Sequence, residues 1–116
     1  MKIYKTRIDI VRPSSVENFI KIMNDWHKRG LYANSVHTMQ KMDRLNGNTL
    51  EIELVSASKT SITNAVALSF GYDFRKKHFK KDIAQAYKEN VSIFKNYSTK
   101  EKLEIAKNAK QIEYID

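Results

Sequence analysis

The densest charge in the sequence is the run Arg75-Lys76-Lys77-His78-Phe79-Lys80-Lys81, which places five cations within seven residues. Lysine and arginine side chains neutralise phosphates, so such a run has the chemistry that polyanion binding needs. Cations at the start of a helix oppose the helix dipole by about 0.3–1 kcal/mol each. An unfavourable local choice of this kind points to function. The free backbone N–H groups of a helix start add an anion-binding element.

This run begins the longest helix that the sequence predicts, over residues 74–97, with Asp73 as its cap. At about 100° per residue the helix has an apolar, a basic and a mixed polar sector. The residues that we predict to contact nucleic acid are Arg75, Lys76, Lys77, Lys80, Lys81, Lys88 and Lys95, extended by Lys28 and Arg29 on the first helix. The alternative is an ordinary solvated face, because long Lys stems also cover apolar surface while their heads stay in water.

The net charge of +8, from 21 basic and 13 acidic residues, is unevenly distributed. Residues 1–34 and 71–97 each have a net charge of +4, and the other two segments are neutral. Richness in Lys, Ile and Asn is typical of AT-rich coding sequence, so we expect a cytoplasmic bacterial protein, with phage origin as an alternative. No apolar run approaches the ~18 residues of a membrane span, and there is no signal-peptide pattern, so we expect no membrane partner.

Candidate catalytic groups do not form a recognisable constellation. No two of His27, His37 and His78 have a ligand-like spacing, and with no cysteine a thiolate site is excluded. Asp43 and Glu51 are near cross-strand neighbours in the predicted hairpin, but no third acid accompanies them. We therefore expect no cofactor, no metal and a non-catalytic protein. A hydrolase acting on nucleic acid is the enzymatic alternative.

Periodicity predicts a strand, then a helix, at the N-terminal end. Residues 3–11 alternate, and Pro13 ends the strand. The Ser14 to Glu17 spacing predicts a capping box, and Gly30 is a natural helix terminator. A hairpin follows over residues 36–55 around Asn46-Gly47. Its first arm is either a strand, which we prefer because the second arm needs a neighbour, or a short helix capped by Ser35.

The remaining pattern predicts helices and a last strand. Residues 59–70 form a short helix after a hydroxyl-rich loop, with capping the preferred role of that loop. Ser98 and Glu101 have a second capping-box spacing, which begins a helix ending near Asn108. Residues 112–115 form a terminal strand. This order predicts a single α+β domain over residues 1–116, a ferredoxin-like split β-α-β sandwich with one or two extra helices.

The open face of the predicted sheet tests a common RNA-binding mode. If the first and third strands are the central pair, the open face carries Ile3, Lys5, Arg7 and Asp9 beside Thr49, Glu51, Glu53 and Val55. This set contains no aromatic residue on which bases could stack, which argues against an RNA recognition motif. Its opposite charges instead predict cross-strand pairs.

Two functions remain. We expect a small accessory protein that binds DNA or RNA through a basic helix flank, mainly by backbone contacts. The alternative is a modulator or inhibitor of the kind encoded by phages and mobile elements, which binds a host protein. The surface for a protein partner could also join two copies of this chain in a homodimer. Exposed aromatics would favour it; the candidates are Trp26, Tyr32, Tyr72 and Phe74, with Met39 and Met42. A helix-turn-helix at residues 62–71 is disfavoured, because Lys77 and Lys80 stand where apolar residues are needed.

Overall fold

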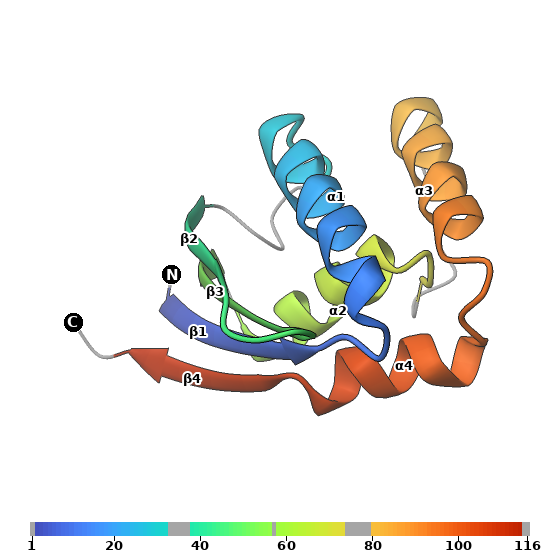
Figure 1. Cartoon of the computed structure of the whole chain (residues 1–116). Helices are drawn as coiled ribbons and strands as arrows, with labels where there is room; N and C mark the ends of the chain where they lie inside the picture. Colours follow the sequence, from blue (N-terminus) through green and yellow to red (C-terminus); the bar gives the residue numbers. More distant parts are fainter. Residues whose placement is uncertain (1, 33–37, 57, 74–79, 115–116) are drawn as a thin grey trace.

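The computed structural model describes residues 2–32, 38–56, 58–73 and 80–114, with backbone alone in 38–43 and 113–114. The chain is α+β, with a four-stranded sheet and, in the described part, four α-helices (Figure 1). The elements in chain order are β1 (Lys2–Asp9), α1 (Val16–Lys28), β2 (Thr38–Arg44), β3 (Thr49–Ser56), α2 (Lys59–Ser69), α3 (Lys81–Ile93), α4 (Thr99–Asn108) and β4 (Lys110–Tyr114).

The strands lie in the order β2-β3-β1-β4, and every neighbouring pair is antiparallel. β1 and β3 are therefore the central pair. Alternate side chains of both strands are buried beneath the helices, with Ile8, Leu50 and Ile52 fully inaccessible. The other face of the sheet is not covered by a described helix (Figure 1). The helices thus cover one face, and the core lies between them and the sheet.

The first arm of the hairpin is the strand β2, which confirms the preferred interpretation over the short helix. The loop is not the tight turn that we predicted, because Gly47 does not have a positive φ. Instead, the Asn46 side-chain oxygen accepts hydrogen bonds from the backbone N–H groups of Asn48 and Thr49, at 3.2 and 3.0 Å. The asparagine side chain therefore closes the loop as an Asx turn.

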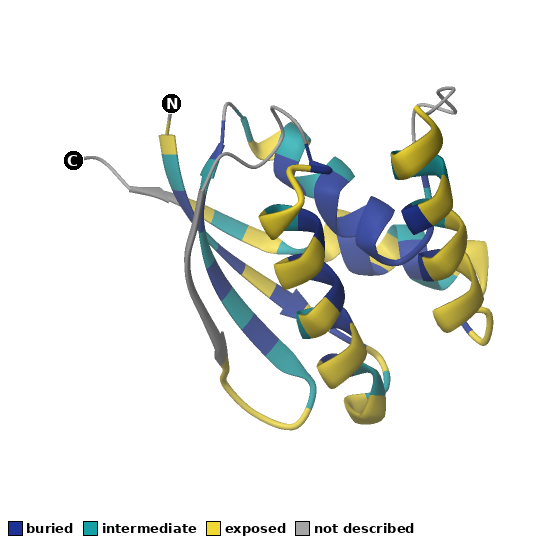
Figure 2. Cartoon of the chain, turned by 90° about the horizontal axis from the view of Figure 1, so that it is seen from above, coloured by how far each residue is buried: buried dark blue, intermediate teal, exposed yellow. Residues whose placement is uncertain are grey.

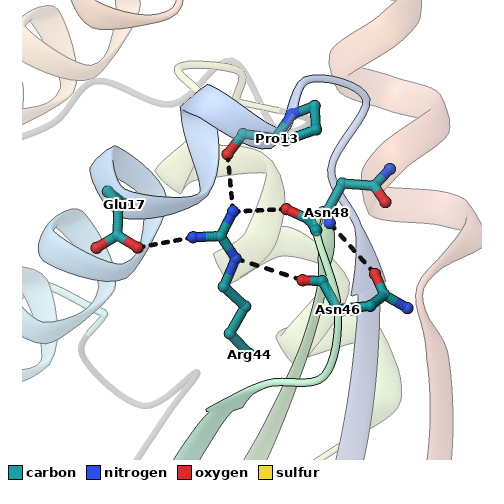
Figure 3. A network of polar contacts seen from close by, with 6 residues as sticks. Pro13, Glu17, Arg44, Asn46 and Asn48 are labelled. Atoms are coloured by element: carbon teal, nitrogen blue, oxygen red, sulfur yellow. Dashed lines mark hydrogen bonds and ion pairs between the residues drawn. The ribbon is translucent and has the colours of Figure 1, made fainter.

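Arg44 fastens this hairpin to the start of α1 (Figure 3). Its guanidinium donates to the Glu17 carboxylate at 2.9 Å and to the Pro13 carbonyl at 3.3 Å. It also donates to the carbonyls of Gly47 and Asn46, at 2.6 and 3.3 Å. A planar fork with five donors can serve several acceptors at once, which a lysine cannot.

The two predicted capping boxes have different outcomes. At α4 the Ser98 hydroxyl accepts from the Glu101 N–H at 3.1 Å, and the Ser98 N–H donates to Glu101 Oε1 at 3.0 Å. That backbone bond is the main cause that lowers the pKa of Glu101. At α1 the prediction was wrong, because a 3₁₀ turn over Pro13–Ser15 precedes the helix and its N-cap Ser15 makes no side-chain cap bond.

α3 is shorter than the predicted helix over 74–97. Lys80 has φ −59° and ψ 156°, which is not helical, so the helix begins at Lys81. It ends at Ile93, so the predicted end at residue 97 was wrong, while residues 74–79 of the predicted helix lie outside the described residues. The observed start places Asp82 in the first turn, where a carboxylate suits the helix dipole and additional cations would not. After the end of α3, Phe94 and Tyr97 are buried in the core.

Aromatic side chains join the helices above the sheet. Phe70, at the end of α2, stacks on Phe19 of α1 with ring centroids 4.6 Å apart. It also contacts Phe94 at 4.8 Å and Tyr97 at 5.7 Å. Burial of such rings contributes strongly to core stability. Phe70 therefore connects α1 to the chain that follows α3.

Candidate polyanion interface

The described part of the predicted basic flank lies on the outer side of α3. Ala86 and Asn90 are the buried residues of this helix. Because Lys81 and Lys88 lie on the opposite side of the helix, they point to solvent, and both are exposed. Seven residues of helix separate them by about 10 Å along the axis. We call Lys80, Lys81, Lys88 and Lys95, all of them exposed, the α3 lysine row.

The charges of the α3 lysine row are not compensated by neighbours. None of its four members has an ion pair with another described residue. On α1, by contrast, Arg29 pairs with the Asp25 carboxylate at 3.0 Å, in the i, i+4 arrangement. Lys28 beside it is exposed. The α3 lysine row therefore presents positive charge that a polyanion could neutralise without first breaking a salt bridge.

The basic end of α1 and the start of α3 lie on the same side of the molecule. The two helices run in opposite directions, so the C-terminal end of α1 and the N-terminal end of α3 face the same way in both views (Figures 1 and 2). α2 contacts both helices and lies between them. Lys28 and Arg29 are therefore on the side that also carries Lys80 and Lys81.

Several predicted residues lie outside the described parts of the chain. They include three of the proposed nucleic-acid contacts, Arg75, Lys76 and Lys77, and also Phe74, His37 and His78. For Met39 and Met42 only the backbone is described. The interface is accordingly built from the α3 lysine row together with Lys28 and Arg29.

The open face of the sheet carries the charge pairs that the sequence predicts. Glu51 accepts from Arg7 Nε at 2.8 Å and lies 3.6 Å from Lys5 Nζ, and the Arg7 bond is the main cause that lowers its pKa. The Thr49 hydroxyl donates to the Asp9 carboxylate at 2.7 Å. The positive and negative charges of this sheet face therefore largely neutralise each other between β1 and β3.

The other candidate sites have structural roles. His27 is half-buried on α1. Ser58 accepts from the Ser61 N–H at 3.1 Å, so the hydroxyl-rich loop caps α2 as expected. Among the residues that the structure describes, no three acids or histidines are placed to hold a metal ion. Asp43 is opposite Glu51 in the strand register, but its side chain is not described.

Two further features bear on partners. Trp26 and Tyr32 are buried, so they seal the core rather than form a contact patch, and Tyr72 is half-buried. A shallow pocket of about 180 Å³ with a mixed polar and apolar lining lies between the end of β1 and α4, lined by Asp9, Val11, Glu104, Ile105 and Asn108. Within the described ranges, no helix is long and apolar enough to cross a membrane.

Sequence reasoning missed a polar junction at the C-terminal end of α2. The Asn90 amide of α3 donates to the Leu68 carbonyl at 3.1 Å. The Tyr87 hydroxyl of α3 and the Lys102 amine of α4 both lie near the Gly71 carbonyl, at 3.4 and 3.5 Å. These contacts satisfy carbonyls that the end of a helix leaves without intrahelical partners. We call these five residues the three-helix junction.

Burial distinguishes the polar members of this junction from surface residues. Asn90 is 2% exposed and Lys102 is 7% exposed. Burial lowers the pKa of Lys102. Asn90 follows Ala86 and precedes Phe94 by four residues each, so helical spacing alone places it on the buried stripe. For Lys102 no such signal exists, because its burial depends on where α2 ends.

Comparison with protein-family models, with curated proteins and with solved structures gave no match in any of the three. The functional argument accordingly depends on the geometry above.

Proposed function

We propose that this protein binds nucleic acid through phosphate contacts made by the α3 lysine row, with Lys28 and Arg29 of α1 extending the interface. The observation that carries the proposal is the placement of four exposed lysines on α3 and directly beside its two ends, without an ion pair to any described residue. Phosphate contacts of this kind are independent of sequence and are dominated by counterion release. Arg75, Lys76 and Lys77, which lie outside the described residues, belong to the same proposed interface.

The finer fold assignment is also a proposal. We interpret the sheet as the ferredoxin-like split β-α-β arrangement with additional helices between β3 and β4. The strand order β2-β3-β1-β4 and the antiparallel register of each pair support it. In this interpretation the sheet face, whose charges pair with one another, has a structural role, and the helices bind the nucleic acid. We place such an accessory protein in the cytoplasm, and phage origin stays a hypothesis.

The proposal is tested by the salt dependence of binding. The ligand is a duplex longer than the 38 Å longest dimension of the protein, about 12 base pairs at 3.4 Å each. We expect log Kd to rise linearly with log salt concentration, with a slope near 0.9 for each duplex phosphate contact. Lys81→Glu/Lys88→Glu should weaken binding by more than about tenfold and reduce that slope by about 2.

A matched control separates a local contact from overall charge. Lys59→Glu/Lys110→Glu changes the net charge equally, but at exposed residues of α2 and β4 outside the interface. This variant should bind within a fewfold of the wild type. Equal losses in both double variants would show that net charge alone causes binding, and an unchanged affinity of Lys81→Glu/Lys88→Glu would refute the interface.

A protein partner is the second candidate, and exposed apolar residues on the same helix favour it. Val91 and Ile93 are 38% and 47% exposed on α3. Apolar side chains beside a row of cations also suit a protein surface with acidic and apolar groups. In this case the protein is a modulator of the kind encoded by phages and mobile elements. Its complex would persist at high salt, whereas a nucleic-acid complex would dissociate.

A further inference from the structure

α3 packs on the core along its length, with Ile83 and Ala86 in its first half, and its described polar contacts with the end of α2 come from its second half. Tyr87, Asn90 and Val91 meet the end of α2, and Phe94 follows directly in the core. Toward the other end of the helix, Lys81 is exposed. The directional contacts that bear on where the lysines project are therefore those at the three-helix junction.

Asn90 is suited to fix the rotation of α3 about its own axis. Its bond to the Leu68 carbonyl is directional, unlike an apolar contact, because a hydrogen bond weakens steeply when it bends. On a helix, the direction of one side chain determines the direction of all others. Lys88 precedes Asn90 by two residues and therefore points to the opposite side. An inward Asn90 thus requires an outward Lys88.

A second contact, between the backbones of Gly71 and Val91, fixes the distance between the end of α2 and α3. A Cβ atom on Gly71 would lie 2.7 Å from both the Cα and the N of Val91, so the two backbones are in direct contact. Backbone atoms cannot move aside as a flexible side chain can. Rotation and distance of α3 are therefore determined together, by a hydrogen bond and by a close approach.

We infer that Asn90 is a positioning residue of the proposed interface. Its bond to Leu68 holds α3 in the rotation that turns Lys81 and Lys88 outward. The row begins with Lys80 and Lys81, at the end of α3 that faces the same way as the end of α1 with Lys28 and Arg29. A single polyanion can then contact both helices. This inference depends on the proposed function, since it explains how two separate basic segments act as one binding surface.

The test is a double-mutant cycle between the two basic segments. The affinity for the duplex defined above is measured for the wild type and for Lys28→Glu/Arg29→Glu, each with and without Asn90→Ala. In the wild-type background the α1 variant should weaken binding by about fivefold or more, because both helices contact one ligand. In the Asn90→Ala background its effect should fall below about twofold, because α3 no longer directs the ligand toward α1. Asn96→Ala, at an exposed residue after α3, is the control and should preserve the fivefold effect.

Each outcome decides between distinct conclusions. If folded Asn90→Ala keeps the full effect of the α1 variant, Asn90 does not position the interface, while the proposed function stands. If the wild type shows no salt-dependent binding, the proposed function fails, and the inference fails with it. If circular dichroism shows that Asn90→Ala is unfolded, Asn90→Leu takes its place with the same criteria, since it removes the amide that donates to Leu68 while filling a similar buried volume.

Discussion

The Cα atom of Val91 lies 2.7 Å from the point that a Cβ atom on Gly71 would occupy. Gly71 also has φ +80°, a conformation that side-chain-bearing residues rarely adopt. It ends α2 in a Schellman motif, in which Gly71 N–H donates to Leu68 and Tyr72 N–H to Ala67, at 3.0 and 2.9 Å. One glycine therefore ends a helix and admits the backbone of the next.

Substitution of this glycine should be strongly destabilising. Gly71→Ala adds a backbone clash to the strain of a positive φ, and we expect it to lower the free energy of unfolding by about 2–5 kcal/mol. Gly30→Ala is the matched control, because Gly30 has φ +69° but open space around its Cβ position. It should cost only about 1–2 kcal/mol. Urea unfolding of both variants measures the difference, and equal costs would contradict the clash.

The capping box of α4 should contribute measurably to stability. Ser98→Ala removes the acceptor for the Glu101 N–H and should lower the free energy of unfolding by about 1 kcal/mol. Ser15→Ala is the control at α1, since the Ser15 side chain makes no cap bond. Thermal or urea unfolding should show little effect of this second change. A loss at Ser15 as large as that at Ser98 would contradict the assignment.

Arg44 should hold the β2–β3 loop against the start of α1. Arg44→Ala removes four hydrogen bonds from a partly exposed network, and we expect a loss of about 1–2 kcal/mol in the free energy of unfolding. The backbone N–H of Thr49 should exchange with solvent faster in this variant. Arg44→Lys should restore little of the lost free energy of unfolding, because a lysine ammonium cannot replace the planar guanidinium with its several donors. Arg29→Ala, which removes one surface pair, should cost only about 0.3–0.5 kcal/mol.

Lys102 should make stability depend on pH in the alkaline range. Burial lowers the pKa of its amine, so folding disfavours the charged form. This unfavourable contribution is present below the folded pKa and disappears as pH rises toward the ordinary range of lysine. Lys102→Met should therefore gain stability relative to the wild type at pH 7, and the gain should shrink toward about pH 10.

The control for this pH dependence is on the same helix. Lys100→Met replaces an exposed lysine of α4, and the gain at pH 7 should be larger for Lys102→Met than for this variant, because Lys102 is buried and Lys100 is exposed. Urea unfolding of the three proteins at both pH values gives the comparison. A pH-independent difference for Lys102→Met would show that the buried amine is not the cause.

The sequence predicted the features that depend on neighbours along the chain. Alternation identified the buried face of β1, and the Ser98 to Glu101 spacing identified the start of α4. The Ser14 to Glu17 spacing is the same, yet no cap forms. A 3₁₀ turn occupies Pro13–Ser15, and the Glu17 carboxylate is bound by Arg44 from a hairpin far along the chain. Local patterns cannot anticipate such competition from a distant residue.

The part of the candidate site that depends on neighbours along the chain was also predictable. Exposure of Lys81 and Lys88 follows from helical periodicity, but the start of α3 at Lys81 does not. Asp73 as a cap predicted a start at residue 74, whereas Lys80 has a φ of −59° and a ψ of 156° and is not helical. The three-helix junction was not predictable, because burial of Lys102 depends on how α4 packs against the end of α2, and no pattern along the chain encodes that tertiary contact.

The antiparallel pairing of β1 with β4 sets Ile3 directly opposite Tyr114. Both ends of the described chain therefore lie together at one end of the sheet, away from α3 (Figure 1). A fluorophore, an affinity tag or a surface linker at either end would consequently leave the helical side accessible. Protein immobilised through either end can thus be titrated with long nucleic acids, and attachment through the N-terminal end and through the C-terminal end should give the same affinity.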